Sequence, residues 1–365
     1  MTAATGVDGF TGAVAVSAVD LMADALGRAG ADPQDAMVRL TERGLLDRPR
    51  ATTTISANGS CRLLSAADAP VAVNLPRPDD LDLLAAWLDV DAHADATTPW
   101  DAIAVALAAR PAQEVVATAQ ELGLAVAMVP RSAVDHVDAQ LEARGTLDPS
   151  RPFLRTVGGG RVATRSMRGV RVVDLSSLWA GPLCSRLLAD AGAEVIKVES
   201  TTRPDGLRVG DAPMFERLHQ GKTMVSVPFH CGSEPLRSLL ASADVVIEGS
   251  RPRALERLGI DPAAVVAARP GAVWVSITAY GRTGPWRNRV GFGDDTAAAA
   301  GLLDRSGEGA SAAFGFVGDA IADPLTGAVA AALVVDAVAA GGGLLLDVAL
   351  REVARTAALG ASVAW

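Results

Sequence analysis

Asp323 is a candidate for chemistry and stands immediately before Pro324, at the start of an expected alanine-rich helix over 324–340. A carboxylate at that place is stabilised by the helix dipole and by free N–H groups. It either caps the helix, with Pro at the first helical position, or acts as a nucleophile toward a carbonyl carbon if its surroundings are dry. Spacing alone favours the cap. Asp319 is the nearest competing carboxylate.

Residues 169–199 are the clearest structural unit, and their pattern predicts a strand, a loop, a helix and a second strand. The apolar, β-branched run 170–175 is typical of a buried parallel strand. A turn at 180–182, a helix over 183–191 and a strand over 195–199 complete the unit. A loop that follows a parallel strand is where nucleotide-like ligands usually bind.

Strands and helices alternate through the rest of the second half, which predicts a parallel sheet covered on both faces. Further strands are expected over 223–227, 244–248, 272–277 and 344–348, and helices over 235–241, 254–258, 292–303 and 324–340. The first half predicts two helices within 10–46, strands over 52–56, 61–64, 71–75 and 124–129, and helices over 79–88, 100–109 and 112–122. We therefore expect an α/β protein with a Rossmann-like large domain and a smaller α+β domain.

Composition excludes several classes of protein. The 365 residues are 50% hydrophobic and carry a net charge of −9, so a nucleic-acid partner is not expected. Cys61, Cys184 and Cys231 show no disulfide or metal-ligand spacing, which indicates a reducing, cytoplasmic location and no metal. The first ten residues lack a signal-peptide pattern. The apolar run 328–340 is too short to span a bilayer and contains Asp336, so no membrane association is expected.

Four sequence blocks, in this order, resemble the class III CoA-transferases, the family of carnitine CoA-transferase, formyl-CoA transferase and α-methylacyl-CoA racemase. The blocks are 169–199; 220–222; 245–252 with 255–259; and 275–292, followed by 322–327 and 344–350. Each block is short, but their order and spacing make the resemblance specific, and together they cover about half of the chain.

The resemblance implies an acyl-CoA:carboxylate CoA-transferase that takes coenzyme A as part of its substrate and needs no metal. It implies that Asp323, three residues before Thr326-Gly327, is the nucleophile that forms an acyl anhydride and then an aspartyl-CoA thioester. The CoA-binding residues that it implies are Leu178, Trp179 and Ala180 in the first loop, Lys222, Arg251 and Arg257 as basic residues, and Tyr280 and Gly281 near the thioester. An interlocked homodimer is also implied.

Several residues depart from the family pattern and leave other functions open. Gly249-Ser250 replace an Asn-Phe pair, Ala279 replaces a glycine, and residues 341–343 replace a basic turn. These changes weaken the expected pocket, so a non-catalytic CoA-binding homologue is one alternative. A racemase or isomerase of the same fold is another. The racemase branch has a His where this chain has Phe292, which cannot shuttle a proton, and acyl transfer is therefore favoured.

The order of the blocks along the chain predicts a circular permutation. The family begins with these blocks, whereas here they start near the middle, and residues 52–130 resemble the later family portion. We therefore interpret 1–145 as the family's small C-terminal portion, 146–168 as a linker and 169–365 as the Rossmann-like CoA-binding and catalytic portion. The alternative is that residues 1–165 form an unrelated Ala-rich domain.

Overall fold

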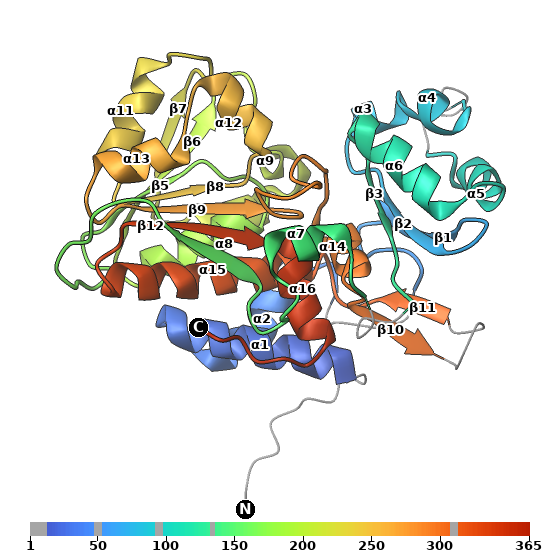
Figure 1. The fold of residues 1–365 in the computed structure, drawn as a ribbon, viewed down its shortest axis with the longest axis horizontal. Helices are drawn as coiled ribbons and strands as arrows, with labels where there is room; N and C mark the ends of the chain where they lie inside the picture. Colours follow the sequence, from blue (N-terminus) through green and yellow to red (C-terminus); the bar gives the residue numbers. More distant parts are fainter. Residues whose placement is uncertain (1–12, 47–52, 92–97, 132–135, 307–312) are drawn as a thin grey trace, which may run out of the picture.

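The chain folds into two lobes that lie side by side (Figure 1). The computed structural model describes residues 13–46, 53–91, 98–131, 136–306 and 313–365. The segment examined for a signal peptide and the first residue of the expected strand 52–56 lie outside these ranges. The large lobe is built around a seven-stranded sheet, and the small lobe, within residues 53–131, around a three-stranded sheet.

The strands are β1 (Cys61–Ser65), β2 (Pro70–Asn74), β3 (Ala125–Met128), β4 (Phe153–Val157), β5 (Arg171–Asp174), β6 (Glu194–Ser200), β7 (Thr223–Val227), β8 (Val245–Glu248), β9 (Val273–Thr278), β10 (Leu303–Ser306), β11 (Ala313–Phe316) and β12 (Leu344–Ala349). The helices are α1 (Ala13–Ala29), the 3-10 turn η1 (Pro33–Asp35), α2 (Ala36–Leu40), α3 (Pro78–Leu81), α4 (Leu84–Leu88), α5 (Trp100–Ala108), α6 (Ala112–Leu122), α7 (Ala139–Arg144), α8 (Ala180–Asp190), α9 (Leu207–Gly210), α10 (Ala212–His219), α11 (Glu234–Ser242), α12 (Pro252–Leu258), α13 (Pro262–Ala268), α14 (Gly293–Ala299), α15 (Ala322–Ala339) and α16 (Leu350–Ala358).

The large sheet confirms the predicted α/β class. Its strand order is β4-β12-β9-β8-β5-β6-β7, with β4 antiparallel to β12 and the other neighbours parallel. From β5 the chain adds β6 and β7 on one side, and then crosses over to add β8, β9 and β12 on the other. The winding reverses between β5 and β8, and in open α/β sheets the crevice outside the carboxyl ends of two such strands is where ligands bind.

Helices cover both faces of this sheet (Figure 1), so every residue of the central strands β8 and β9 is buried. Successive side chains of a strand point to opposite faces. On β8, Val245 and Ile247 pack into the core that contains α8 and α15, whereas Val246 packs into the core of the opposite face, beneath α11 and α13.

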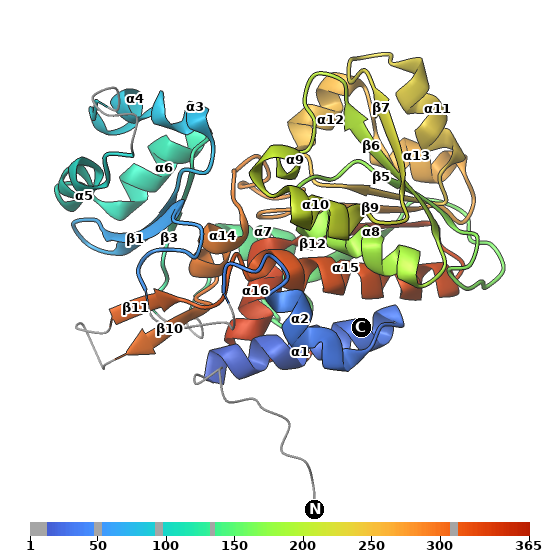
Figure 2. The same cartoon turned by 180° about the vertical axis from the view of Figure 1, so that it is seen from behind.

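Helix α15 is the central helix of the large lobe and is apolar all round. It lies between α8 and α1 (Figure 2), and its alanine-rich surface lets these helices approach closely. A Cβ at Gly327 would stand 2.5 Å from the carbonyl oxygen of Ala180, so only glycine permits the contact with the start of α8. Among the described residues, α15 alone has the length and apolar composition to cross a membrane, and 78% of it is buried inside the fold.

Two segments differ from the expected division of the chain. Helix α1, placed by the sequence in the N-terminal region of 1–145, packs on α15 of the large lobe through residues such as Ala18, Met22 and Ala25. Strand β4, within the expected linker 146–168, is the antiparallel edge of the large sheet. The exposed side chains of its residues 155–157 gave it no apolar pattern that the sequence could show.

The small lobe is an antiparallel sheet of order β1-β2-β3 with helices α3 to α6 on one face. The predicted helix over 79–88 is divided into α3 and α4. The other face packs on the large lobe, where Cys61 and Ala72 meet Ala298 of α14 and Phe316 of the hairpin β10–β11.

Candidate active site at the switch point of the sheet

The loops that follow β5 and β8 meet at the crevice of the sheet and carry four of the predicted CoA-binding residues. Residues 178–180 follow β5 and lead into α8, and Arg251 follows β8 at the N-terminal cap of α12. The loops touch each other, since a Cβ at Gly249 would lie 4.0 Å from the Cβ of Ser176. The two loops that carry these residues therefore meet at the place where the topology predicts a ligand.

Leu178 is held in an unusual backbone conformation by a buried ion pair. Its φ of 68° is left-handed, which few residues other than glycine adopt. Its N–H donates to both carboxylate oxygens of Asp205, at 3.1 and 3.2 Å. Asp205 lies 3.2 Å from Nζ of buried Lys197, which also donates to the carbonyl oxygen of Ser176. Buried polar contacts thus hold the backbone of this loop, and the Leu178 side chain remains exposed.

Lys222 lies behind this loop and away from the surface. Its Nζ donates to the carbonyl oxygen of Pro182 at 2.9 Å and to Oγ of Ser185 at 2.6 Å, and lies 3.5 Å from Asp174. Burial lowers the pKa of Lys222 to about 8. Burial acts to raise the pKa of Asp174, but Lys222 and Lys197 outweigh it and lower that pKa to about 2. This placement does not match the predicted phosphate contact of Lys222, which instead fastens the start of α8.

Asp323 lies in the first turn of α15, beside the residues that follow β5. Its carboxylate packs against the backbone of Gly293, whose N–H acts to lower the pKa of Asp323, and its Oδ2 lies 2.6 Å from the position of a Cβ at residue 293. The residue keeps part of its surface exposed. Burial of the carboxyl and the charge of Asp294 raise the pKa of Asp323 to about 7, against the opposing charge of Arg43. A weakly solvated carboxylate that ionises near neutral pH is suited to nucleophilic attack.

Asp319, the competing carboxylate, is occupied by an ion pair. Nε of Arg43 donates to its Oδ2 at 2.7 Å, and the Asp319 side chain is 3% exposed. Arg43 also lies over the Trp179 ring, with its guanidinium carbon 5.7 Å from the ring centroid. One arginine therefore connects the loop after β5 to the acidic surroundings of Asp323, and Asp323 itself has no ion-pair partner among the described residues.

Two further carboxyls stand in the first turn of α14, and the charge of one of them, Asp294, acts on Asp323. Asp294 accepts the N–H of Ala320 at 2.9 Å, and burial together with Asp319 raises the pKa of Asp294 to about 7. Asp295 accepts from Nδ2 of Asn74 in the small lobe at 2.8 Å, and burial raises its pKa to about 8. The sequence did not assign Asp294, Asp295 or Arg43 to the site. The adjacent Asp294 and Asp295 at the start of an expected helix could have indicated a site from the sequence. No sequence pattern singles out Arg43.

Tyr280 and Gly281 are covered by helix α7. Nε2 of Gln140 donates to the Tyr280 carbonyl oxygen at 2.6 Å, and a Cβ at Gly281 would overlap the Arg144 guanidinium. The Tyr280 ring meets Trp286 edge to face at 5.6 Å between centroids. Burial raises the pKa of Tyr280. Both residues therefore have packing roles in this structure, and their predicted approach to a thioester stays a prediction.

The remaining residues of sequence interest divide between the two edges of the sheet. Phe292 directly precedes Gly293, so a residue at 292 is adjacent to the group that contacts Asp323. Arg257 is exposed on α12. The glycine turn 341–343 precedes β12 and so lies at the amino edge of the sheet, away from the crevice, with a Cβ at Gly342 barred by the carbonyl oxygen of Gly271. The missing basic turn therefore does not alter the crevice.

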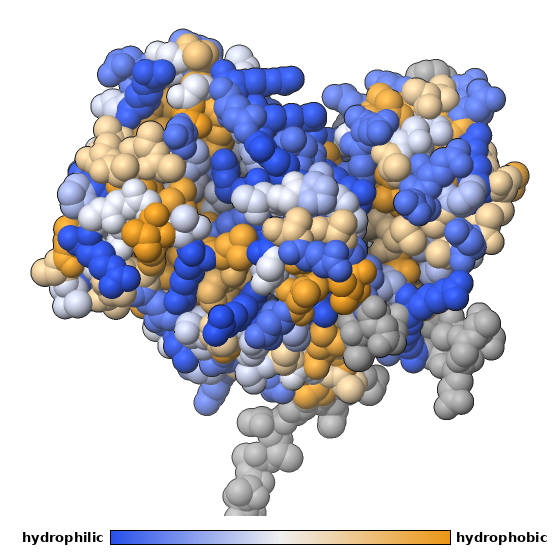
Figure 3. Space-filling view, in the orientation of Figure 1, coloured by the Kyte–Doolittle hydropathy of each residue, from blue (hydrophilic) through white to orange (hydrophobic). Residues whose placement is uncertain are grey.

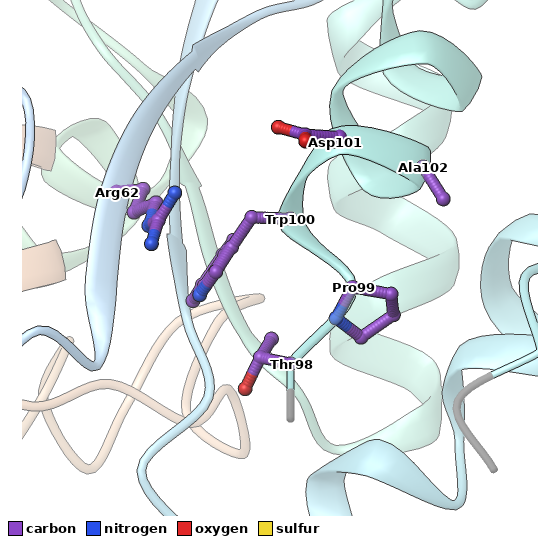
Figure 4. Close-up of a pocket in the computed structure, with 6 residues that line it drawn as sticks. All are labelled: Arg62, Thr98, Pro99, Trp100, Asp101 and Ala102. Carbon is purple, nitrogen blue, oxygen red and sulfur yellow. The ribbon is translucent and has the colours of Figure 1, made fainter. Parts of the chain in front are cut away.

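Two features bear on other kinds of site. Within the described ranges, the His, Cys, Asp and Glu side chains form no group that could hold a metal ion. A shallow recess occurs on the small lobe (Figure 4), lined by Arg62, Thr98, Pro99, Trp100, Asp101 and Ala102. There the Arg62 guanidinium stacks on the Trp100 ring at 4.6 Å. The recess shares no residue with the surroundings of Asp323.

Comparisons with known proteins identify relatives that match part of the chain. An acyl-CoA transferase of Fusarium pseudograminearum is 32% identical over 221 residues, which cover 55% of this chain and 48% of that protein. A succinate–glutarate CoA-transferase of Agrobacterium fabrum is 31% identical over 208 residues, covering 51% of each chain. A (R)-2-hydroxy-4-methylpentanoate CoA-transferase of Clostridioides difficile is 37% identical over 139 residues, covering 34% of this chain and 35% of that protein. The chain thus spans about half or less of the length of these relatives.

Among solved structures, a CAIB/BAIF family protein from Brucella suis matches with a TM-score of 0.45 and 31% identity, covering 53% of this chain and 55% of that one. The family model described as CoA-transferase family III matches residues 167–362. That match spans more than half of the sequence and contains both loops of the crevice, α14 and Asp323. The chain therefore belongs to CoA-transferase family III.

Proposed function

We propose that this protein is an acyl-CoA:carboxylate CoA-transferase whose nucleophile is Asp323. One observation carries the proposal: the Asp323 carboxylate stands at the start of α15, next to the N–H of Gly293, beside the loops at the switch point of the sheet. A CoA nucleotide over residues 178–180 and Arg251 would direct its thioester toward this carboxylate. Family membership supports CoA as the group transferred.

The first half of the reaction converts the donor thioester into an enzyme thioester. A carboxylate oxygen of Asp323 attacks the thioester carbonyl carbon, the carbon–sulfur bond breaks, and CoA thiolate leaves a mixed anhydride behind. The thiolate then attacks Cγ of Asp323, so that the donor acid leaves as a carboxylate and aspartyl-CoA remains. No proton is taken up or released in either step.

The acceptor acid repeats these steps in reverse. Its carboxylate attacks Cγ of the aspartyl thioester and expels CoA thiolate, which then attacks the acceptor carbonyl carbon of the new anhydride. The acceptor acyl-CoA forms and the Asp323 carboxylate is restored. Donor N–H groups near the carbonyl oxygen lower the barrier of such steps, and the N–H of Gly293 is in position to orient the attacking carboxylate.

A racemase would need a proton acceptor and a proton donor on either side of the α-carbon. Phe292, adjacent to Gly293, supplies neither, which favours transfer. Relatives whose names specify glutarate or L-malate make dicarboxylic acids a suitable first class of acceptor to test.

The test is isotope exchange between acyl-CoAs and free labelled carboxylic acids, followed by mass spectrometry of the thioester pool. We expect label in the thioesters with the unsubstituted protein and with Asp336→Asn, a control on the same helix. We expect none with Asp323→Asn. Equal exchange by Asp323→Asn would reject this nucleophile, and α-proton exchange in deuterated solvent without CoA transfer would indicate an isomerase.

The expected interlocked homodimer and cytoplasmic location are also proposals. Cys61, Cys184 and Cys231 are free, which agrees with a reducing compartment. Light scattering coupled to size exclusion would test the dimer, since a monomer at micromolar concentration would contradict it.

A further inference from the structure

Two arginines from different lobes converge on the C-terminal end of α6. Nη2 of Arg77, at the start of α3, donates to the carbonyl oxygen of Gly123 at 2.7 Å. Nη1 of Arg251, at the crevice of the large lobe, lies 3.9 Å from the position of a Cβ at Gly123. The two guanidinium groups are therefore neighbours across the boundary between the lobes, although like charges repel.

Arg251 has no counter-charge in the part of the chain that the structure describes. It is half-buried, and its side chain makes no hydrogen bond or ion pair with a described residue. Burial and then the charges of Arg253, Arg77, Arg203 and Arg257 lower the pKa of Arg251. An arginine that is kept partly buried among like charges lacks the anion that would compensate it.

Two other arginines of the large lobe show what compensation by an acid looks like. Arg144 pairs with Glu352 at 2.7 Å, and Arg282 pairs with Glu248 at 2.7 Å. No described acid pairs with Arg251 in this way. Its guanidinium is therefore available to an external anion.

The Arg77 guanidinium is already held in a fixed orientation by bonds within the small lobe. Its Nε donates to Oδ1 of Asp80 at 2.8 Å, and Asp80 is buried. With Nη2 on Gly123, Nη1 of Arg77 forms no hydrogen bond with a described residue. A guanidinium that is fixed by other bonds loses little entropy when it binds a planar oxyanion.

Arg251 stands on the switch-point loop after β8, and Arg77 lies near Phe292 at the start of α14. The guanidinium carbon of Arg77 is 6.0 Å from the centroid of the Phe292 ring, and Phe292 precedes the glycine that contacts Asp323. Figure 3 shows hydrophilic side chains gathered on the flank of the large lobe that faces the small lobe, across a hollow between them. A substrate that reaches Asp323 from the crevice would pass these two side chains.

We propose that Arg77 and Arg251 together bind an anionic group of the acyl-CoA substrate and so join the two lobes around it. The group is either a phosphate of CoA or a second carboxylate on the acyl chain, since both present paired oxygens to guanidinium forks. The proposal rests on the proposed function, because it assumes an acyl-CoA ligand. It adds a substrate contact from the small lobe, which the sequence did not assign.

Calorimetric titration tests the proposal in the Asp323→Asn protein, where no turnover interferes. The probes are butyryl-CoA and succinyl-CoA, which differ by the terminal carboxylate, together with CoA and 3′-dephospho-CoA. Arg77→Gln and Arg251→Gln are compared with Arg168→Gln, a control that removes an exposed arginine of the large lobe. We expect each of the two variants to weaken binding by at least about tenfold, and the control to leave it unchanged.

The pattern of losses identifies the anionic group. Equal losses for both thioesters would assign the pair to a phosphate of CoA, with 3′-dephospho-CoA showing whether it is the 3′-phosphate. A loss confined to succinyl-CoA would assign it to the acyl carboxylate. Unchanged binding by either variant would overturn the proposal.

Two controls keep these outcomes interpretable. Arg251→Gln should melt at the same temperature as its parent or higher, because it removes an uncompensated charge. Arg77→Lys keeps the charge and serves if Arg77→Gln fails to fold, since the loss of its fork should still weaken binding. If the parent protein binds none of the four probes, both this proposal and the proposed function fail. Normal binding without exchange would reject the proposed function alone.

Discussion

The main-chain N–H of Gly293 and the carboxylate of Asp323 are in direct contact, and Oδ2 of Asp323 lies 2.6 Å from the place where any side chain at residue 293 would begin. The first turn of α14 and the first turn of α15 therefore enclose the nucleophile together. A Cβ at Gly293 would also stand 2.3 Å from the carbonyl oxygen of Ala320.

Gly293→Ala should consequently damage both the site and the packing of the two helices. We expect CoA exchange to fall by at least ~100-fold, because the carboxylate is displaced from its bonding position. The added methyl group should lower the free energy of unfolding by about 1–3 kcal/mol. Exchange assays and urea denaturation measure the two effects, and Gly210→Ala, at an open glycine of α9, is the control. Full activity of Gly293→Ala would contradict the described contact.

The activity should depend on the ionisation of Asp323. Burial and Asp294 raise the pKa of Asp323 to about 7, and only the carboxylate is nucleophilic. The rate constant kcat/KM should therefore fall as the pH drops through about 7 and level off above it. A profile measured from about pH 5 to about pH 9 tests this. A rate that is constant down to about pH 5 would contradict the raised pKa.

Arg43→Gln should move that profile to higher pH. Burial and Asp294 raise the pKa of Asp323, and the Arg43 charge opposes them, so its removal raises that pKa further. The variant should also lose about 3 kcal/mol of stability, because Asp319 loses its partner in a buried place. Arg39→Gln on α2 is the matched control. An unchanged pH profile of kcat/KM would show that Arg43 contributes to packing and not to the pKa of Asp323.

Asp295 should make the protein less stable as the pH rises. Burial raises its pKa to about 8 in the folded state, from an ordinary value of about 4, so between these values the folded state binds more protons than the unfolded state. Its stabilising contribution is complete below about pH 4 and is lost as the pH rises through about 8. Asp295→Asn should flatten the decline in melting temperature between about pH 5 and pH 8. If the slope of melting temperature against pH does not change in this variant, Asp295 is not the source of the decline.

Lys222→Met should affect stability much more than CoA affinity. The substitution leaves buried Asp174 with less compensation and should cost about 3 kcal/mol, while Lys222 itself does not reach the surface. The double variant with Asp174→Asn should recover part of the loss. Chemical denaturation and CoA titration separate the two effects. A tenfold loss of CoA affinity with unchanged stability would restore the phosphate contact that the sequence predicted.

The fold was predictable where the signal is local. The run of β-branched residues at 170–175 gave β5, and Pro111 and Gly123 set the limits of α6, which ends where Gly123 adopts a left-handed backbone. The expected helix over 292–303 was too long, because α14 ends at Ala299 and Leu303 begins β10. Leu303 packs with Cys61 and Ala72 of the small lobe, a contact between distant segments that sequence periodicity does not reveal.

The site was predictable to a similar extent. The βαβ unit predicted a ligand edge at the loop after β5, and the spacing before Thr326-Gly327 in the family resemblance singled out Asp323. The roles of these residues stay predictions. The pairing of Arg43 with Asp319 joins residues 276 positions apart, and no local pattern records it. Lys222 was assigned from a sequence block that resembles the family. Its burial depends on Asp174 and on the packing of α8, which the sequence does not reveal. The predicted circular permutation stays a prediction, since the structure shows where 1–145 packs and not how the chain arose.

The most direct test of the central claim follows oxygen atoms. If an acceptor acid labelled with ¹⁸O in its carboxylate attacks aspartyl-CoA, one of its oxygens remains on Asp323 when the new acyl-CoA leaves. The protein, incubated with an acyl-CoA and labelled acids, is digested, and the peptide that contains Asp323 is weighed and fragmented. We predict ¹⁸O on Asp323 and not on Asp319 or Asp294. Transfer of CoA with no ¹⁸O on Asp323 would contradict the proposed mechanism.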